Sequence, residues 1–126
     1  TTIASAVSDP LTGYEQDGDY TLRHIIESGG MALSVSDEQI MRMAELLASK
    51  EGVYCESTAA VSAAVAQKMS AEGLVHADSS IVCLVTGSGL KDTDLYARHT
   101  PLSEPLDATE EAIDAFIRKV DPTIPL

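Results

Sequence analysis

Apolar side chains recur every three or four positions in four parts of the chain, a spacing that predicts helices. The predicted helices cover residues 20–28, about 15 residues after position 36, residues 58–72, and a last stretch whose apolar face is Ile113, Phe116, Ile117 and Val120. A glycine follows each of the first three, as expected of a helix that ends on a left-handed residue. The pattern therefore predicts four helices.

Two of these helices are preceded by residues that can satisfy the free N–H groups of a first turn. Ser36-Asp37-Glu38-Gln39 is a capping box, in which the Ser36 hydroxyl accepts the Gln39 amide and the Gln39 side chain reaches back. Asp107-Ala108-Thr109-Glu110 repeats this pattern, with Asp107 in the capping position. We therefore expect helices to begin directly after Ser36 and after Asp107.

Short apolar runs between the helices predict strands at residues 31–35, 53–55 and 81–85. The run at 81–85 is β-branched and aliphatic throughout, which suits a strand buried on both faces of a parallel sheet. Strands that alternate with helices imply crossover connections, so the predicted fold class is α/β, a parallel sheet flanked by helices. So few strands leave both edges of the sheet open, and a partner segment is expected to cover them.

The chain of 126 residues fits one domain. Residues 1–18 hold turn formers and few periodic apolar positions, which predicts a connecting segment; residues 19–94 form the α/β core, and residues 95–126 a C-terminal extension with a helix. The N-terminus has neither a methionine nor a basic region followed by an apolar core. Thr1 is therefore expected to mark a cut.

Composition removes several classes of partner. No apolar run approaches the roughly 20 residues of a spanning helix, so no membrane span is predicted. The formal net charge is −12 and the sequence has no basic cluster, which argues against nucleic acid. Cys55 and Cys83 lie in apolar runs without a CxxC pair, so free, buried thiols in a reducing cytoplasm are expected.

In an open parallel sheet, ligands bind at the carboxyl ends of the strands. Glu56 follows one predicted strand, and Thr86-Gly87-Ser88-Gly89 follows another. A hydroxyl with flexible backbone amides can contact a neutral ring nitrogen or a phosphate. Two plainer interpretations stay open: the glycines can belong to a tight turn at positive φ, and Glu56 can simply cap the next helix.

Other chemistry finds no support, and no catalytic residue or metal ligand is predicted. His24, His76 and His99 lie far apart and lack metal-ligand spacing. No serine stands in a GxSxG elbow. A Schiff-base lysine needs a partly desolvated site, and none of the four lysines is expected to have one. These are Lys50, Lys68, Lys91 and Lys119.

Four blocks in order and in register resemble the C-terminal part of threonine synthases, over about residues 1–94. They are Glu27-Ser-Gly-Gly30, Val35-Ser-Asp-Glu38, Glu51-Gly-Val-Tyr-Cys-Glu56 and Val85-Thr-Gly-Ser-Gly-Leu-Lys-Asp92. Threonine synthases belong to the tryptophan-synthase-β-like group of pyridoxal-phosphate enzymes, whose cofactor sits between two α/β domains. The resemblance therefore implies a partial domain of that fold and pyridoxal 5'-phosphate as cofactor.

The resemblance also implies roles for three residues. Thr86 matches a Ser or Thr that hydrogen-bonds the pyridine nitrogen, Gly87 follows it in the cofactor-binding segment, and Glu56 matches a glutamate near the cofactor. The family's usual proline after that glutamate is Ser57 here, and its usual small polar residue is Ala59. A neutral hydroxyl leaves the ring nitrogen largely unprotonated, which suits elimination and replacement chemistry.

In this family the Schiff-base lysine and the glycine-rich phosphate loop belong to the earlier half, which this sequence does not contain. The isolated chain is therefore expected to be inactive towards the family reaction, in which a carbon–oxygen lyase converts O-phosphohomoserine and water to threonine and phosphate. Expected partners are a missing N-terminal portion or another subunit, and an amino-acid substrate. The alternatives are cysteate synthase, a serine/threonine dehydratase, and a freestanding noncatalytic regulatory module.

Overall fold

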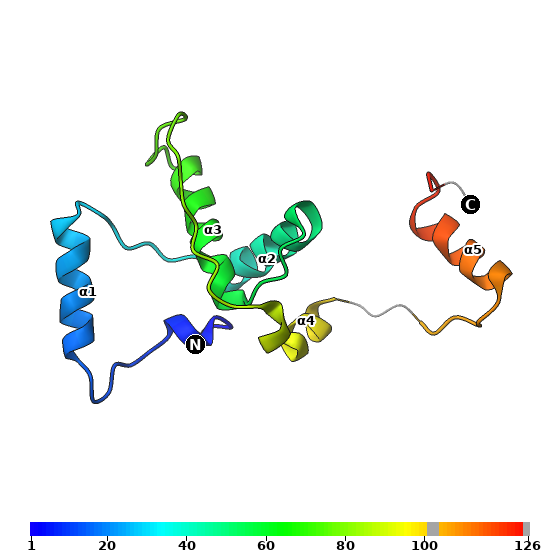
Figure 1. Ribbon diagram of the computed structural model, residues 1–126, viewed down its shortest axis with the longest axis horizontal. Helices are drawn as coiled ribbons and strands as arrows, with labels where there is room; N and C mark the ends of the chain where they lie inside the picture. The colour runs from blue at the N-terminus through cyan, green and yellow to red at the C-terminus, as the bar shows by residue number, and fades with distance from the viewer. Residues whose placement is uncertain (101–103, 125–126) are drawn as a thin grey trace. The chain divides into compact units, whose positions relative to one another are not determined.

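A computed structural model describes residues 1–100 and 104–124. Residues 101–103 and 125–126, which fall within the predicted C-terminal extension, lie outside these ranges. The chain divides into two units, Thr1–Thr93 and Asp94–Leu126. Its helices are labelled in Figure 1: α1 (Gln16–Glu27), α2 (Asp37–Glu51), α3 (Ser57–Ala71), α4 (Thr93–His99) and α5 (Glu110–Val120), with short 3-10 helices η1 (Ser5–Val7) and η2 (Gly89–Lys91).

The start and the end of α2 follow from the sequence as predicted. Gln39 N–H donates to the Ser36 hydroxyl at 3.2 Å, and the Ser36 N–H donates to Gln39 Oε1 at 2.8 Å, so both bonds of the capping box are present. At the other end Gly52 has a left-handed backbone, with φ of 68°. The predicted helix of about 15 residues is therefore confirmed at both ends.

The core of the first unit lies between α2 and α3, which are the two long helices that pack together. Its buried members are small or medium in size: Ala4, Ile40, Met43, Ala44, Cys55, Ala59, Ala60 and Ala64. The alanines of α3 have almost no side chain to hold the helices apart, so the backbones can approach closely. This core is small, and α2 contributes Ile40, Met43 and Ala44 to it.

Helices α1, α3 and α5 agree with prediction in position but less well in their limits, and α4 was not predicted. Helix α1 begins four residues before the predicted start, with Asp17 and Asp19 in its first turn, where carboxylates favour the positive end of a helix. The predicted cap of α5 is wrong: Thr109, not Asp107, accepts the Ala112 N–H, at 3.2 Å. The third residue after Thr109 is an alanine, so no reciprocal bond completes a capping box there.

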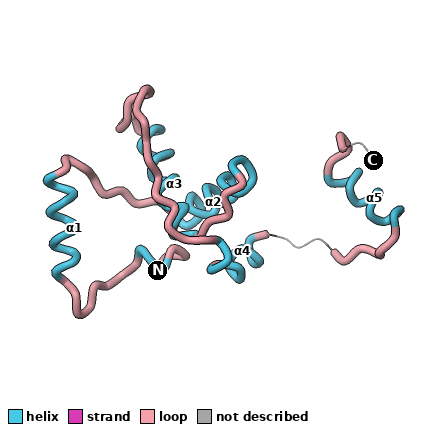
Figure 2. The backbone as a smooth tube through the Cα atoms, in the orientation of Figure 1, coloured by secondary structure: helices cyan, strands magenta, loops and turns pink. Residues whose placement is uncertain are grey.

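The predicted parallel sheet is not formed in the part of the chain that the structure describes, where Figure 2 shows helices and loops only. Residues 31–35 and 81–85 are extended but do not pair as strands. Of residues 53–55, only Cys55 pairs, in a single antiparallel bridge with Ser88. The predicted helices are thus present, but the parallel sheet of the predicted α/β class is not confirmed.

The extended segments bond to side chains of α3 instead of to one another. The Ser62 hydroxyl donates to the Leu84 carbonyl at 2.9 Å, and Lys68 Nζ donates to the Ser34 carbonyl at 2.9 Å. A strand exists only where a neighbouring backbone supplies its hydrogen bonds. Neither segment has such a neighbour among the described residues, which is the physical reason that the apolar runs stay single.

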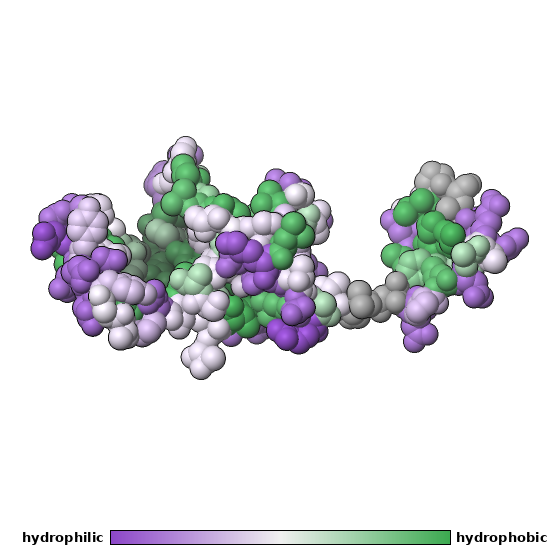
Figure 3. All heavy atoms as spheres, turned by 60° about the horizontal axis from the view of Figure 1, so that its bottom comes forward, coloured by the Kyte–Doolittle hydropathy of each residue, from purple (hydrophilic) through white to green (hydrophobic). Residues whose placement is uncertain are grey.

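Apolar side chains of the 81–85 segment lie open to solvent. Val82 is 85% exposed and Leu84 is 71% exposed, although both were predicted to be buried on the faces of a sheet. Figure 3 shows hydrophobic areas of this kind on the surface of the first unit. No helix of the described residues is long and apolar enough to cross a membrane.

Candidate functional site

Two loops that are more than 30 residues apart meet at the start of α3. The Glu56 N–H donates to the Gly87 carbonyl at 2.9 Å, and the Gly89 N–H donates to the Tyr54 carbonyl at 3.1 Å. We call this meeting of residues 54–57 with residues 86–92 the loop junction. It brings together two predicted site residues, Glu56 and Gly87, from the ends of two predicted strands.

Gly87 makes the loop junction possible because it has no side chain. A Cβ at this position would overlap the Glu56 carboxylate and would lie 3.0 Å from Glu56 Cβ. Gly87 does not have a positive φ, so the interpretation of a tight turn in the left-handed region is wrong here. What the site requires of Gly87 is close approach to Glu56.

Gly89 has the same function against an aromatic ring. A Cβ there would lie 2.6 Å from Tyr54 Cε2, well inside van der Waals contact. Gly89 is buried, and it also lacks a positive φ. The two glycines of the Gly-Ser-Gly string are therefore selected by the space that Glu56 and Tyr54 occupy.

Glu56 lies at the N-cap position of α3, but its side chain accepts no hydrogen bond from the first turn. The interpretation of Glu56 as a simple helix cap is therefore wrong. Its carboxylate is 16% exposed, and Lys91 Nζ lies 3.4 Å from Glu56 Oε2. The Glu56 carboxylate thus faces the 86–92 loop, with a cation from the same loop beside it.

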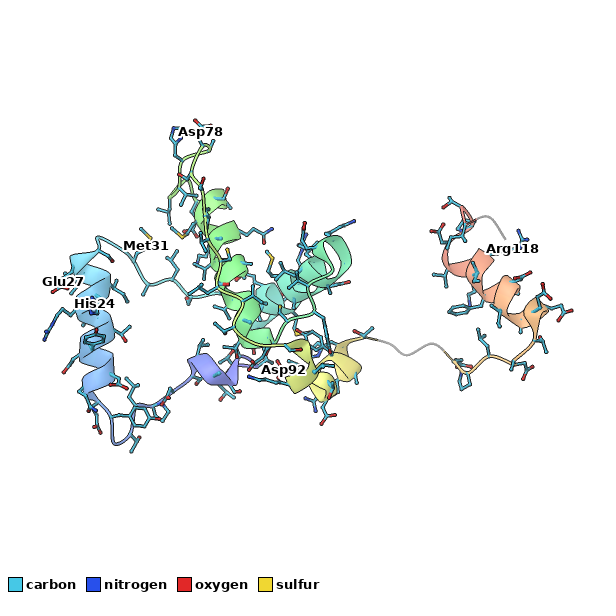
Figure 4. All side chains as sticks on the ribbon, in the orientation of Figure 1. His24, Glu27, Met31, Asp78, Asp92 and Arg118 are labelled. Atoms are coloured by element: carbon cyan, nitrogen blue, oxygen red, sulfur yellow. The ribbon has the colours of Figure 1, made fainter. Side chains whose placement is uncertain are left out.

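Asp92 caps α3 in place of Glu56. Its Oδ2 atom accepts the Ser57 N–H at 2.7 Å and the Ser57 hydroxyl at 2.6 Å. Figure 4 labels Asp92 next to the first turn of α3. The buried Ser57 thus donates twice to the same carboxylate oxygen. Sequence reasoning missed both residues, because nothing local in the sequence links positions 35 apart.

Thr86, the third predicted site residue, is the first residue of the 86–92 loop in the loop junction. Its side chain is exposed, and its hydroxyl makes no hydrogen bond with another described residue. A free hydroxyl beside Gly87 is chemically able to donate to, or accept from, a ring nitrogen. The loop junction thus carries a hydroxyl at Thr86 and a carboxylate at Glu56, and the hydroxyl has the chemistry needed for the ring nitrogen of pyridoxal phosphate.

The histidines have only local partners. His24 Nδ1 lies 3.7 Å from Glu27, His76 Nδ1 lies 3.6 Å from Asp78, and a ring nitrogen of His99 lies 2.8 Å from the Leu95 carbonyl. Figure 4 shows His24 and Glu27 on α1 and Asp78 beyond the far end of α3. Among the residues described, no group of three or more histidine, cysteine, aspartate or glutamate side chains is placed to hold a metal ion.

None of the four lysines is buried, and all lie within the described ranges. Lys68 is the least exposed, at 28%, and it donates to a carbonyl while Glu72 lies 3.9 Å away. Lys91 is 66% exposed and pairs with Glu56. A desolvated amine of the kind that forms a Schiff base is therefore not found among them.

The two cysteines are not joined in a disulfide, and they differ in burial. Cys55 is 1% exposed, next to the loop junction, and burial raises the pKa of its thiol. Cys83 is only partly buried, with Sγ 3.8 Å from the Ser62 carbonyl. The expectation of two buried thiols therefore holds fully for Cys55 alone.

Comparison with known proteins agrees with these features. Residues 1–87 match the family described as pyridoxal-phosphate dependent enzyme. The chain is 41% identical over 97 residues to a threonine synthase of Methanocaldococcus jannaschii, which covers 77% of the chain and 23% of that protein. It is 38% identical over 91 residues to a threonine synthase of Halalkalibacterium halodurans, covering 72% of the chain and 25% of the relative.

A third threonine synthase, from Methanosarcina acetivorans, is 35% identical over 116 residues, which are 89% of the chain and 28% of the relative. The chain thus spans about a quarter of the length of the curated relatives it matches. The family described by the match has pyridoxal phosphate as its cofactor, as the four motifs predicted. The resemblance to threonine synthases is confirmed, and the chain belongs to the family of pyridoxal-phosphate dependent enzymes.

Proposed function

We propose that the chain forms one side of the cofactor site of a threonine synthase-like enzyme, which converts O-phosphohomoserine and water to threonine and phosphate. The observation that carries the proposal is the loop junction, because it brings Glu56 against Gly87 and leaves the Thr86 hydroxyl free beside them. The proteins compared above are themselves named threonine synthase, which supports this substrate over that of a related enzyme.

Pyridoxal phosphate, when bound, supplies the electron sink that stabilises a substrate carbanion. In this proposal the Thr86 hydroxyl binds the ring nitrogen as a neutral partner and leaves it largely unprotonated. Glu56 lies on the same side, with Lys91 3.4 Å from its carboxylate. Gly87 keeps the space between the two loops free of a side chain, so that the backbone next to Thr86 can approach Glu56.

In this proposal a partner supplies the desolvated lysine and the phosphate-binding groups that these residues lack. None of the chain's lysines is desolvated, and a net charge of −12 gives no local excess of cations for the cofactor phosphate. We propose that an N-terminal portion of the same enzyme, or another subunit, provides the Schiff-base lysine and the phosphate loop. The complete enzyme is proposed to be cytoplasmic, and the isolated chain inactive.

Reconstitution tests the proposal. The chain is mixed with pyridoxal phosphate, alone and together with an N-terminal portion that carries the lysine and the phosphate loop, and visible absorbance and phosphate release from O-phosphohomoserine are measured. The chain alone is expected to give neither signal, and the combination both. Cofactor binding without release of phosphate would contradict the threonine synthase assignment and favour a related enzyme. If the two parts do not associate, a freestanding noncatalytic module is the better description.

Thr86 is tested in the reconstituted enzyme by Thr86→Ala and Thr86→Ser. Loss of the hydroxyl is expected to weaken cofactor binding about fivefold to tenfold, since a neutral hydrogen bond contributes ~1 kcal/mol. The serine variant keeps the hydroxyl and is expected to bind like the wild type. Equal cofactor affinity in all three proteins would remove Thr86 from the site.

A further inference from the structure

The position of Glu56 is fixed by bonds on both sides of it. On one side its own N–H donates to the Gly87 carbonyl at 2.9 Å. On the other side the next N–H, that of Ser57, donates to Asp92 Oδ2 at 2.7 Å. Both acceptors belong to the 86–92 loop, so that loop sets the backbone from which the Glu56 side chain projects.

The bond to Asp92 is the stronger of these two anchors. It is charge-assisted, and Asp92 accepts the Ser57 hydroxyl as well, at 2.6 Å. The carboxylate lies at the positive end of the 15-residue helix α3, whose first turn has no side-chain cap of its own. Ser57 is 1% exposed, so water does not replace these bonds easily.

We propose that Asp92 is a positioning residue for the cofactor site: by capping α3 from the opposite loop, it holds the Glu56 carboxylate against Gly87 and beside Thr86. This inference rests on the proposed function. Asp92 itself is not proposed to contact the cofactor. It acts through Ser57 and the backbone of Glu56, and its loss releases one of the two anchors while the bond to Gly87 remains.

Asp37 offers a matched control. It too stands at the start of a long helix, and it accepts bonds from a distant part of the chain, namely the Thr2 hydroxyl and the Ile3 N–H, the latter at 3.3 Å. Its loss removes the same charge and a pair of long-range bonds at a helix start, while Ser36 still caps α2. Asp92→Ala therefore releases the first turn of α3 from the 86–92 loop, whereas Asp37→Ala releases residues 2 and 3 from α2.

The test compares both variants in the complete, cofactor-loaded enzyme. Cofactor dissociation constant, fluorescence spectrum of the bound cofactor, kcat and KM separately, and melting temperature are measured. Both variants are expected to have a lower melting temperature. Only Asp92→Ala is expected to weaken cofactor binding, by about tenfold, and to change the fluorescence spectrum, because a small misplacement of the groups that bind the cofactor is costly. Removal of a negative charge would by itself favour an anionic cofactor, so weaker binding reports position and not charge.

Two conservative variants complete the test. Asp92→Asn keeps an oxygen that can accept from Ser57 and is expected to restore most of the affinity. Ser57→Ala keeps the backbone bond to Asp92 and loses the hydroxyl bond, so about threefold weaker cofactor binding is expected. If Asp92→Ala does not fold, Ser57→Ala tests the positioning role in its place. Equal cofactor affinity in Asp92→Ala and Asp37→Ala, or wild-type affinity in Ser57→Ala, would overturn the inference. Failure of the wild-type enzyme to bind the cofactor would overturn the proposed function instead.

Discussion

Two residues without side chains determine how closely the loops of the junction approach. Glycine is usually explained by the backbone conformations that it permits. Gly87 and Gly89 have ordinary backbone angles, and their requirement is steric, imposed by Glu56 and by the Tyr54 ring. In the Thr-Gly-Ser-Gly string, two polar residues therefore alternate with two glycines that contact the opposite loop.

Replacement of Gly89 by alanine tests this steric requirement. The new methyl group would meet the Tyr54 ring at 2.6 Å, so the loops must separate or the ring must move. We expect a loss of about 1–3 kcal/mol in the free energy of unfolding, measured with urea. Adding Tyr54→Ala makes room for the methyl group, so the double variant should lose less than the sum of the single ones. Strict additivity would show that the two residues do not compete for space.

The different burial of the two thiols predicts different reactivity. Burial raises the pKa of Cys55, so its reactive thiolate is scarce near neutral pH, and the half-buried Cys83 should be alkylated first. The pKa of Cys55 is higher folded than unfolded, so its contribution to stability is complete below the unfolded value and is lost as pH rises through the folded value. Mass spectrometry of the iodoacetamide products at several pH values measures the order, and faster labelling of Cys55 in the folded chain would contradict it.

The candidate site was predicted in part from the sequence. The rule that ligands bind at the ends of strands selected Glu56 and Gly87, and the structure brings these two together even though the strands themselves do not pair. Asp92 and Ser57 could not be selected, because their bond joins positions that only the folded chain brings together. Their detection needs coordinates, since neither residue belongs to a local capping pattern.

Among the helices, α2 has limits that follow most directly from its local sequence. The contribution of its N-terminal cap to stability can therefore be measured. Ser36→Ala removes the acceptor of the Gln39 N–H and is expected to cost about 1 kcal/mol, within the range of measured caps. Ser34→Ala is the control, because its hydroxyl makes no bond among the described residues and only its carbonyl binds Lys68. Urea unfolding measures both, and equal losses would show that the cap contributes nothing specific.

Helices were predicted better than strands for a physical reason. A helix satisfies its own backbone, so α2 could be located from apolar spacing, a cap and a terminal glycine, and α3 from its alanine-rich sequence and terminal glycine. A strand needs a second backbone, and the run at 81–85 is instead joined to Ser62 of α3, by the Ser62 hydroxyl to the Leu84 carbonyl and by the Cys83 thiol to the Ser62 carbonyl. The sequence of this run is typical of a strand in a buried sheet, but the described residues contain no neighbouring strand to pair with it.

At the scale of the whole molecule, the exposed run at 81–85 predicts where a partner binds. Val82→Lys and Leu84→Lys change side chains that are 85% and 71% exposed, so the stability of the isolated chain should change by less than about 0.5 kcal/mol. Association with the N-terminal portion should weaken at least tenfold, since lysine would be buried in the contact. Calorimetric titration measures the affinity. Val7→Lys, at a 59% exposed site outside this run, is the control, and equal effects at all three sites would contradict the proposed contact.

The cap that Asp92 supplies to α3 from the opposite loop also has a topological consequence. The segment between Ser57 and Asp92 is a closed ring, held by the Asp92 carboxylate and the backbone bonds of the loop junction and not by a covalent bond. Residues 76–80 form an exposed stretch of that ring. A protease nick there would replace an intramolecular closure, with its high effective concentration, by a bimolecular association, and the two pieces would stay together only while their actual concentration exceeded the dissociation constant of the contact between them.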